Sequence, residues 1–195
     1  MSRNTKIIIA IGVGTLAALF LCAGLVFFMV GGLAWNGLSR AVDFDADQVT
    51  AEAAGIAHFQ LPAGYRPNYT FHAAGFTLVA FDPGDNHSHL MLVQAPAWVE
   101  LDPQQFEAQL RRDFGARIQW GENERTTVVD QRTLRVDGEP VEFAVSEGIN
   151  GDGGEYRSMA GVWNSPNGQV LIYIEEPVAR WNQAEIDAFI TTIES

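Results

Sequence analysis

The feature that most constrains this chain is a long apolar run near its N-terminus. Residues 7–35 form 29 consecutive positions that contain none of the chain's 12 basic or 24 acidic residues. A helix needs about 20 apolar residues to cross the hydrocarbon core of a bilayer, whereas a cleavable signal peptide has an apolar core of only about 7–15. The run therefore predicts an uncleaved transmembrane signal-anchor helix, and it excludes an ordinary soluble or disordered chain.

The charges that flank this run predict its orientation. Arg3 and Lys6 lie before it with no acidic residue among them, whereas Asp43, Asp45 and Asp47 soon follow Arg40 on the other side. Basic flanks stay on the cytoplasmic side of a membrane. We therefore expect residues 1–6 in the cytoplasm, one crossing of the cell (inner) membrane, and a C-terminal extracytoplasmic, or periplasmic, region.

Small residues recur at every fourth position of the apolar run, namely Ala10, Gly14, Ala18 and Cys22. Such a stripe lets two membrane helices approach closely, which would give a weak homodimer through the transmembrane helix. The alternative is that small residues are simply frequent in membrane helices. No ionisable group lies within the run, so nothing in it indicates an ion or proton path.

The region that follows the run is strongly acidic. Residues 41–195 contain 9 basic residues, all arginine, against all 24 acidic residues, which gives a net charge of −15. Such a domain repels nucleic acids and anionic headgroups, so no nucleic-acid partner is expected. Lys6 is the only lysine and Cys22 the only cysteine. Lysine-based phosphate loops, disulfides and cysteine-based zinc sites are therefore excluded from this region.

Hydropathy patterning divides the region into a linker and one domain. Residues 36–54 are polar and rich in alanine and aspartate, with a short helix expected over 48–54, and residues 55–195 are expected to form the domain. In its first half we expect strands near 56–61, 67–73, 75–81 and 89–94. A helix is expected next, over 103–115, where Asp102 is its N-cap.

The second half of the domain reads as strands followed by a last helix. Expected strands include 133–136, 141–145, 155–163 and 169–174, and the last is apolar on both faces and should be central. Asp137-Gly138 and residues 166–168 are turns. Asn182 should cap the last helix, with Glu185 completing a capping box. Its core face is expected to be Ile186, Phe189, Ile190 and Ile193. The predicted class is α+β, an antiparallel sheet flanked by helices.

Several stretches resemble a group of uncharacterised bacterial proteins that carry an N-terminal membrane anchor. They are IAHFQLPAGYRP at 56–67, HLMLVQ at 89–94 and the closing segment 168–195. The order of elements also resembles, more distantly, the PsbP/Mog1-type fold. PsbP-like proteins are accessory subunits of a photosynthetic membrane complex, and Mog1 binds a small GTPase, so the resemblance implies a non-catalytic module with a protein partner. No functional motif of either has matching residues here.

The most chemical cluster of the sequence is Asp82, Asp85, His87 and His89. Two imidazoles and two carboxylates could bind zinc or another divalent cation, and in a strand His87 and His89 would share a face. The alternative is a polar turn with solvated side chains. The glycine-rich stretch 150–155 could likewise provide oxygen ligands for Ca²⁺, but its spacing fits a hairpin turn better than an EF-hand. No cofactor is expected.

Catalytic motifs are absent from the sequence. It contains no G-x-S-x-G, no S-x-x-K and no cysteine outside the apolar run, so we do not expect an enzyme. The preferred hypothesis is a single-pass, membrane-anchored extracytoplasmic module that binds a protein partner or assists a membrane complex. The first alternative is a divalent-metal- or small-ligand-binding domain that uses His87, His89 and Asp85. A weaker alternative is an extracytoplasmic hydrolase.

Overall fold

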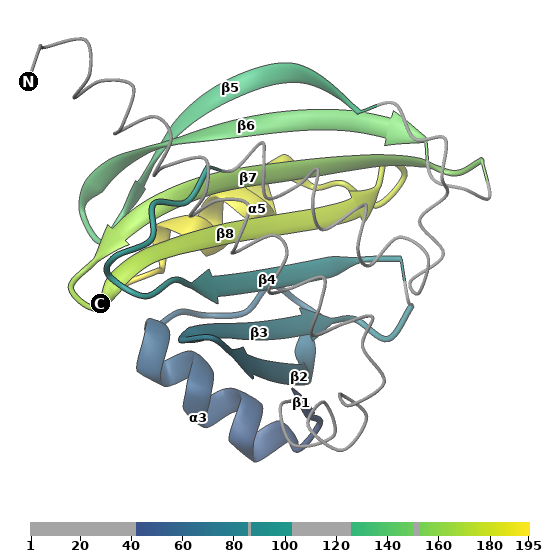
Figure 1. The fold of residues 1–195 in the computed structure, drawn as a ribbon. Coiled ribbons are helices and arrows are strands. Elements are labelled where there is room, and N and C mark those ends of the chain that lie inside the picture. Colours follow the sequence, from purple (N-terminus) through teal and green to yellow (C-terminus); the bar gives the residue numbers. More distant parts are fainter. Residues whose placement is uncertain (1–41, 86, 103–125, 150–152) are drawn as a thin grey trace, which may run out of the picture. The chain divides into compact units, whose positions relative to one another are not determined.

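A computed structural model describes residues 42–85, 87–102, 126–149 and 153–195. The chain divides into two compact units, residues 1–40 and 41–195, and the structure is described for the second. The described residues of this unit form eight strands and two helices (Figure 1). They are β1 (Val42–Asp43), α3 (Ala46–Ile56), β2 (Arg66–Ala73), β3 (Phe76–Asp82), β4 (His89–Gln94), β5 (Thr127–Val136), β6 (Glu139–Ile149), β7 (Glu155–Ser165), β8 (Gly168–Pro177) and α5 (Gln183–Thr191).

All eight strands belong to one antiparallel sheet in the order β1-β2-β3-β4-β8-β7-β6-β5. Strands β1 to β4 form one half of the sheet. Strands β5 to β7 form the other half, with β5 at the outer edge. The last strand, β8, closes the sheet by pairing with both β4 and β7. Every residue from Val170 to Glu176 is buried. This confirms the prediction that residues 169–174 form a central strand, because only an interior strand buries apolar side chains on both faces.

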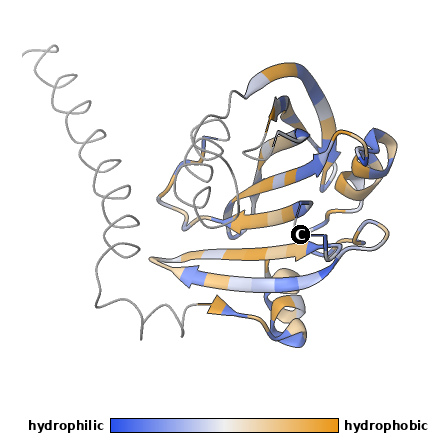
Figure 2. Ribbon diagram, turned by 90° about the vertical axis from the view of Figure 1, so that its right-hand side faces the viewer, coloured by the Kyte–Doolittle hydropathy of each residue, from blue (hydrophilic) through white to orange (hydrophobic). Residues whose placement is uncertain are grey.

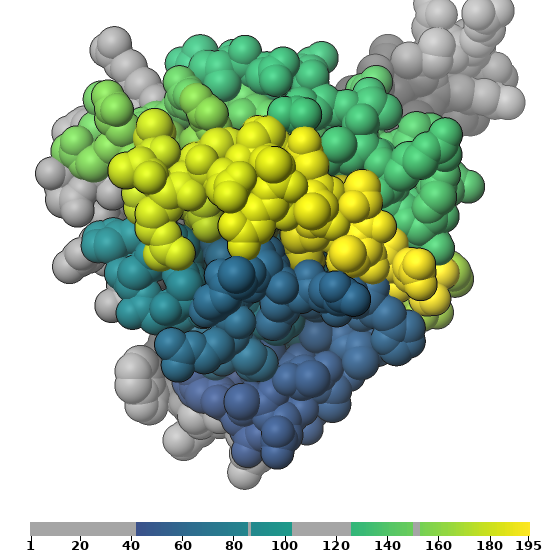
Figure 3. All heavy atoms as spheres, turned by 180° about the vertical axis from the view of Figure 1, so that it is seen from behind, coloured from purple at the N-terminus to yellow at the C-terminus, as the bar shows by residue number. Residues whose placement is uncertain are grey.

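Both helices pack against the same face of the sheet, which we call the helix face. Val49, Ala53 and Ile56 of α3 and Ile186, Phe189 and Ile190 of α5 are buried there. Seen from behind, α5 in yellow and α3 in violet-blue spread over this face (Figure 3). Strand side chains from both halves of the sheet complete the cluster, among them Val79, Leu90, Leu92, Phe143, Met159, Trp163, Ile172 and Ile174.

The opposite face carries a second, smaller apolar cluster. Its buried members are Leu78, Ala80, Met91, Val93, Ala160, Leu171 and Tyr173. Neither helix contributes a residue to it. The inner strands β3, β4 and β8 are therefore apolar on both sides (Figure 2), whereas the first five residues of the outer strand β5 are all exposed.

The last helix begins where the sequence predicts. The side-chain oxygen of Asn182 accepts a hydrogen bond from the backbone N–H of Glu185, as an N-cap should. Ile186, Phe189, Ile190 and Ile193 are all buried, which confirms the predicted core face. The side chain of Glu185, which was expected to bond back to the N-cap residue, makes a different contact. The Glu185 carboxylate accepts from the backbone N–H of Ala63, 2.9 Å away, and so ties the helix to the segment before β2.

The predicted α+β class is wrong. The described chain is mostly β, one eight-stranded sheet with only two short helices of 11 and 9 residues. Within the described ranges both helices lie on one face, so these residues do not show the sheet flanked by helices that the PsbP/Mog1 comparison implied. The error arose because β5 to β8 are each 10 or 11 residues long, whereas the sequence indicates each of them only by a shorter apolar segment.

Residues 56–61 are not a strand either. α3 extends to Ile56, and the segment that follows makes one isolated bridge, between His58 and Glu194. The apolar residues of this segment pack on the helix face without pairing as a strand. The ring of Phe59, for example, lies edge-on to the rings of Phe81 and Phe189, with 5.7 Å between ring centroids in each case. Strands β2, β3 and β4 do follow the predicted ranges closely.

Part of the expected linker, residues 36–54, is folded. β1 pairs with β2, and α3 begins at Ala46 with Asp45 as its N-cap. The Asp45 carboxylate accepts from the backbone N–H groups of Asp47 and Gln48, which identifies the cap that the short predicted helix lacked. The structured domain therefore starts about a dozen residues earlier than residue 55.

Two other expectations concern parts of the chain outside the described residues. They are the transmembrane helix over 7–35, with its stripe of small residues, and the helix over 103–115. Among the residues that are described, no helix is both long and apolar enough to cross a bilayer.

Candidate functional site

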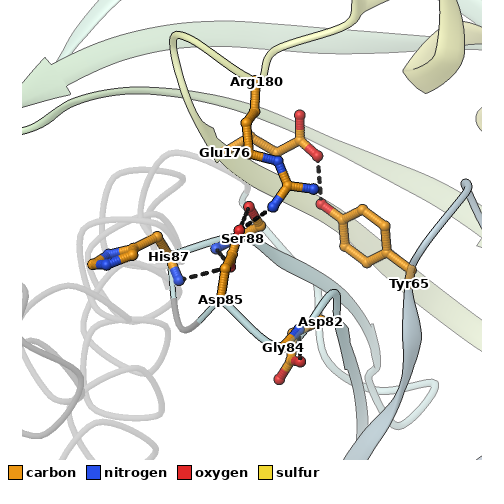
Figure 4. Close-up of polar contacts among 8 residues, drawn as sticks. All are labelled: Tyr65, Asp82, Gly84, Asp85, His87, Ser88, Glu176 and Arg180. Atoms are coloured by element: carbon orange, nitrogen blue, oxygen red, sulfur yellow. Dashed lines mark hydrogen bonds and ion pairs between the residues drawn. The ribbon is translucent and has the colours of Figure 1, made fainter.

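The candidate site is a cluster of polar side chains where the β3–β4 loop meets the end of β8 (Figure 4). The loop is organised by two aspartates. Asp82 accepts the backbone N–H of Gly84 at 2.7 Å. Asp85 accepts the backbone N–H groups of His87 and Ser88 and the hydroxyl of Ser88, each at 2.9 Å. Aspartate side chains commonly fold turns in this way, by accepting N–H groups two or three residues ahead.

Asp85 also binds a residue that is distant in sequence. Arg180 lies three residues after β8. Its guanidinium donates a hydrogen bond to the second carboxylate oxygen of Asp85 and forms an ion pair with it. Partial burial by itself would raise the pKa of Asp85. The N–H of His87, the two groups of Ser88 and the guanidinium of Arg180 outweigh that effect and lower the pKa. Asp85 is therefore an anchored anion with few acceptor positions left for a ligand.

Tyr65 and Glu176 form the buried part of the site. The Tyr65 hydroxyl donates to the Glu176 carboxylate at 2.7 Å, and only 7% of Glu176 is exposed. Burial raises the pKa of Glu176, whereas the Tyr65 hydrogen bond and the nearby Arg180 lower it in part. Burial, together with its hydrogen bond to Glu176, also raises the pKa of Tyr65, so its hydroxyl remains a proton donor.

The four residues singled out as metal ligands are not assembled into a ligand set. Among the described residues, no group of three or more His, Cys, Asp or Glu is placed to hold a metal ion. His87 lies in the loop rather than in a strand, so it does not share a strand face with His89, the first residue of β4. The carboxylate oxygens of Asp85 accept hydrogen bonds from its own loop and from Arg180. The carboxylate of Asp82 accepts a hydrogen bond from the side-chain amide of Asn68.

His89 instead lies in a row of polar residues that the sequence did not reveal. Glu175 on β8 is the cross-strand partner of both His89 on β4 and Ser158 on β7, and Ser158 in turn faces Ser146 on β6. Glu175 is buried and accepts a hydrogen bond from Tyr173. Burial lowers the pKa of His89. Cross-strand register cannot be read from composition, so this row was invisible in the sequence.

The row contains serine, histidine and glutamate, but not in the order that a hydrolytic triad needs. Ser158 and His89 lie on opposite sides of β8, two strand spacings or about 10 Å apart. A nucleophile and its base must approach to about 2.6–3.2 Å. The carboxylate stands between them, where a triad requires the imidazole. The row therefore supports no hydrolase mechanism.

The tryptophans are scattered, as their spacing suggests. Trp163 is buried in the helix-face core, and Trp181 lies under the guanidinium of Arg157, with 5.7 Å between the Arg157 Cζ and the ring centroid. Trp98 is different, because 71% of it is exposed. Trp120 lies outside the described residues.

Comparison with known proteins does not assign the chain to a family. No protein-family model matches it, and no curated protein is similar to it in sequence. The resemblance to anchored bacterial proteins therefore remains a prediction.

Proposed function

We propose that this chain is a single-pass, membrane-anchored extracytoplasmic module that binds a protein partner and is not itself catalytic. The anchor is the uncharged run over residues 7–35, and the basic residues before it orient the domain away from the cytoplasm. The polar cluster offers few free groups for catalysis, since Asp85 bonds Arg180 and Tyr65 bonds Glu176.

The observation that carries the proposal is the outer edge of β5. This strand is the last in the sheet order and pairs only with β6 among the described strands. Seven of its ten residues are exposed. An edge strand of this length presents backbone N–H and C=O groups to which an extended segment of another protein can add as a further strand.

Apolar side chains gather at one end of this edge. Val128 and Val129 are 44% and 49% exposed, and Ile149 at the end of β6 is 55% exposed. Ile149 lies two residues beyond Glu147, the partner of Thr127, so the three side chains lie near one another. Three of the five large exposed hydrophobic residues in the described part of the chain are therefore on this corner, which is typical of an interaction site.

A photo-crosslinking amino acid at Val129 of the full chain, expressed in its native membranes, tests the proposal. We expect one discrete cross-linked protein from position 129 and none from exposed Ala54 on α3, the matched control. Val129→Asp should abolish capture from a probe at Val128 without lowering the melting temperature. Equal, diffuse labelling at positions 129 and 54 would contradict a partner on this edge.

A further inference from the structure

Three turns meet at the end of the sheet opposite to the candidate site. They are residues 73–76 between β2 and β3, 95–99 after β4, and 165–168 between β7 and β8. The backbone N–H of Ala95 donates to the carbonyl of Gln169 at 2.8 Å. Packing is close, because a Cβ on Gly75 would lie 3.5 Å from Pro96 and one on Gly168 would lie 2.5 Å from the carbonyl oxygen of Ala95. We call these three turns the Trp98 tip.

The Trp98 tip has no charged residue, in a domain whose net charge is −15. Its sequences are AAGF, APAWV and SPNG. Trp98 stands out from it with 71% of its surface exposed, and Ala97 beside it is exposed as well. The nearest acidic residues along the chain are Glu100 and Asp102, which follow the tip. An exposed tryptophan among uncharged turns is typical of the membrane–water interface.

The chain also enters the domain from this end. β1 begins at Val42 and runs antiparallel to β2, with Val42 opposite Phe71, so β1 starts at the end of the sheet that carries the 73–76 turn. Only residues 36–41 separate Trp35, the end of the apolar run, from β1. Even fully extended, this connection spans no more than about 25 Å. A domain so closely tethered to a membrane helix must stay near the bilayer.

We infer that the Trp98 tip rests on the lipid surface, with the indole of Trp98 in the headgroup region. The inference rests on the proposed membrane anchor and adds to it an orientation of the domain. One tryptophan binds a bilayer only weakly, but the short tether turns docking into an intramolecular step with a high effective concentration. Since the tip lacks charge, neutral phospholipid is sufficient and anionic lipid is not needed.

Site-specific fluorescence in the full chain tests this orientation. The chain is reconstituted in phosphatidylcholine vesicles as Cys22→Ser with a single new cysteine, at Ala97 in one variant and Ala179 in the other. Both alanines are exposed, and Ala179 follows β8 at the opposite end of the sheet. With an environment-sensitive dye, we expect blue-shifted emission and strong quenching by brominated lipid at position 97 only. In the Ala97→Cys chain, Trp98→Glu should reduce that quenching at least twofold.

Alkaline carbonate extraction of the same vesicles separates the two claims. If the chain resists extraction and positions 97 and 179 are equally exposed to water, the anchor stands and the docking inference is wrong. If carbonate releases the chain, the anchor is wrong and the docking inference falls with it. Protection at position 97 that requires a second protein in the vesicle, and not lipid alone, would also overturn it.

Discussion

The hydroxyl of Tyr65 donates a 2.7 Å hydrogen bond to the carboxylate of Glu176, two residues that lie 111 positions apart in the chain. This bond joins the segment before β2 to the end of β8, the strand that closes the sheet. Glu176 is buried beside Arg180, which in turn holds the β3–β4 loop through Asp85 (Figure 4). Three separate segments therefore meet at this site, which we call the clasp. Removing its hydrogen bonds should lower the free energy of unfolding.

Replacing Glu176 by glutamine should remove a pH-dependent loss of stability. Burial raises the pKa of Glu176 in the folded state, so the folded chain holds this proton more tightly than the unfolded chain does. Stability from this group is present below its ordinary pKa of 4.5 and is lost as pH rises through the raised value. Relative to Glu176→Gln, we expect the melting temperature of the wild type to fall as the pH rises above 4.5.

Tyr65→Phe is the matched control for this titration. The variant removes the donor that favours the ionised carboxylate, so the pKa of Glu176 should rise further and stability should fall more steeply with pH. At neutral pH the loss should be about 1–3 kcal/mol, since a buried acceptor loses its partner. Identical pH profiles for wild type, Tyr65→Phe and Glu176→Gln would show that Glu176 is not a buried titrating group.

Asp85→Ala should destabilise the chain more than Arg180→Ala does. The aspartate holds three groups of its own loop besides the arginine, and we expect a cost of about 1–3 kcal/mol. The side chain of Arg180 is 43% exposed, so the ion pair alone should contribute no more than about 1 kcal/mol. Urea unfolding of the full chain in detergent measures both values.

The effect of Asp85→Ala should also depend on pH in the opposite sense to that of Glu176. Its lowered pKa means that its stabilisation is present above the ordinary value of 3.8 and is lost as pH falls through the folded-state pKa. The difference between wild type and Asp85→Ala should therefore shrink below pH 4. A difference that stays constant down to pH 2 would indicate that the carboxylate is not the group that matters.

Glycine-to-alanine substitutions should separate two kinds of glycine. On β7, a Cβ at Gly161 would lie 2.5 Å from the ring of Phe143, so Gly161→Ala should cost about 1–3 kcal/mol through overpacking. Nothing lies within 4 Å of a Cβ at Gly55 in α3. Gly55→Ala should raise stability by about 0.4–1 kcal/mol. Thermal unfolding of both variants is the test, and equal effects would contradict the packing around β7.

Removing the N-cap of α5 should cost about 1 kcal/mol in Asn182→Ala, because the N–H of Glu185 loses its acceptor. Glu185→Gln keeps an acceptor for the N–H of Ala63 and should cost less. Hydrogen exchange at the amide of Ala63 distinguishes the two roles. Faster exchange in Glu185→Ala but not in Asn182→Ala is expected, and the reverse would show that Glu185 serves the cap instead.

Local signals predicted much of the sheet and the last helix. The Asp137-Gly138 turn is confirmed, with both residues at positive φ as a tight hairpin requires. The boundaries of β4 and the cap of α5 also follow from the pattern, since a short apolar run and a capping residue act over a few residues. Only residues 133–136 of β5 were predicted as a strand, because the first five residues of β5 are exposed and carry no such signal.

Features that depend on distant residues could not be predicted. The clasp needs Tyr65, Asp85 and Arg180 to meet from three segments, and the His89–Glu175–Ser158 row needs the register of three strands. Histidines and aspartates close in sequence suggested a metal site, but turn geometry uses Asp85 to hold its own loop. The fold class failed for a related reason, since the length of each strand is set by its neighbours in the sheet.

The backbone bridge between His58 and Glu194 has a consequence for biogenesis. Each residue donates its N–H to the carbonyl of the other, at 2.7 and 2.9 Å, and Ile193 accepts from Asp137. Because α5 and these last contacts cover the helix face, a nascent chain that lacks them leaves the apolar side of the sheet open. Burial of the helix face therefore requires that residues 183–194 have been synthesised. Until then, the exposed apolar side chains of the sheet make the nascent chain prone to aggregation.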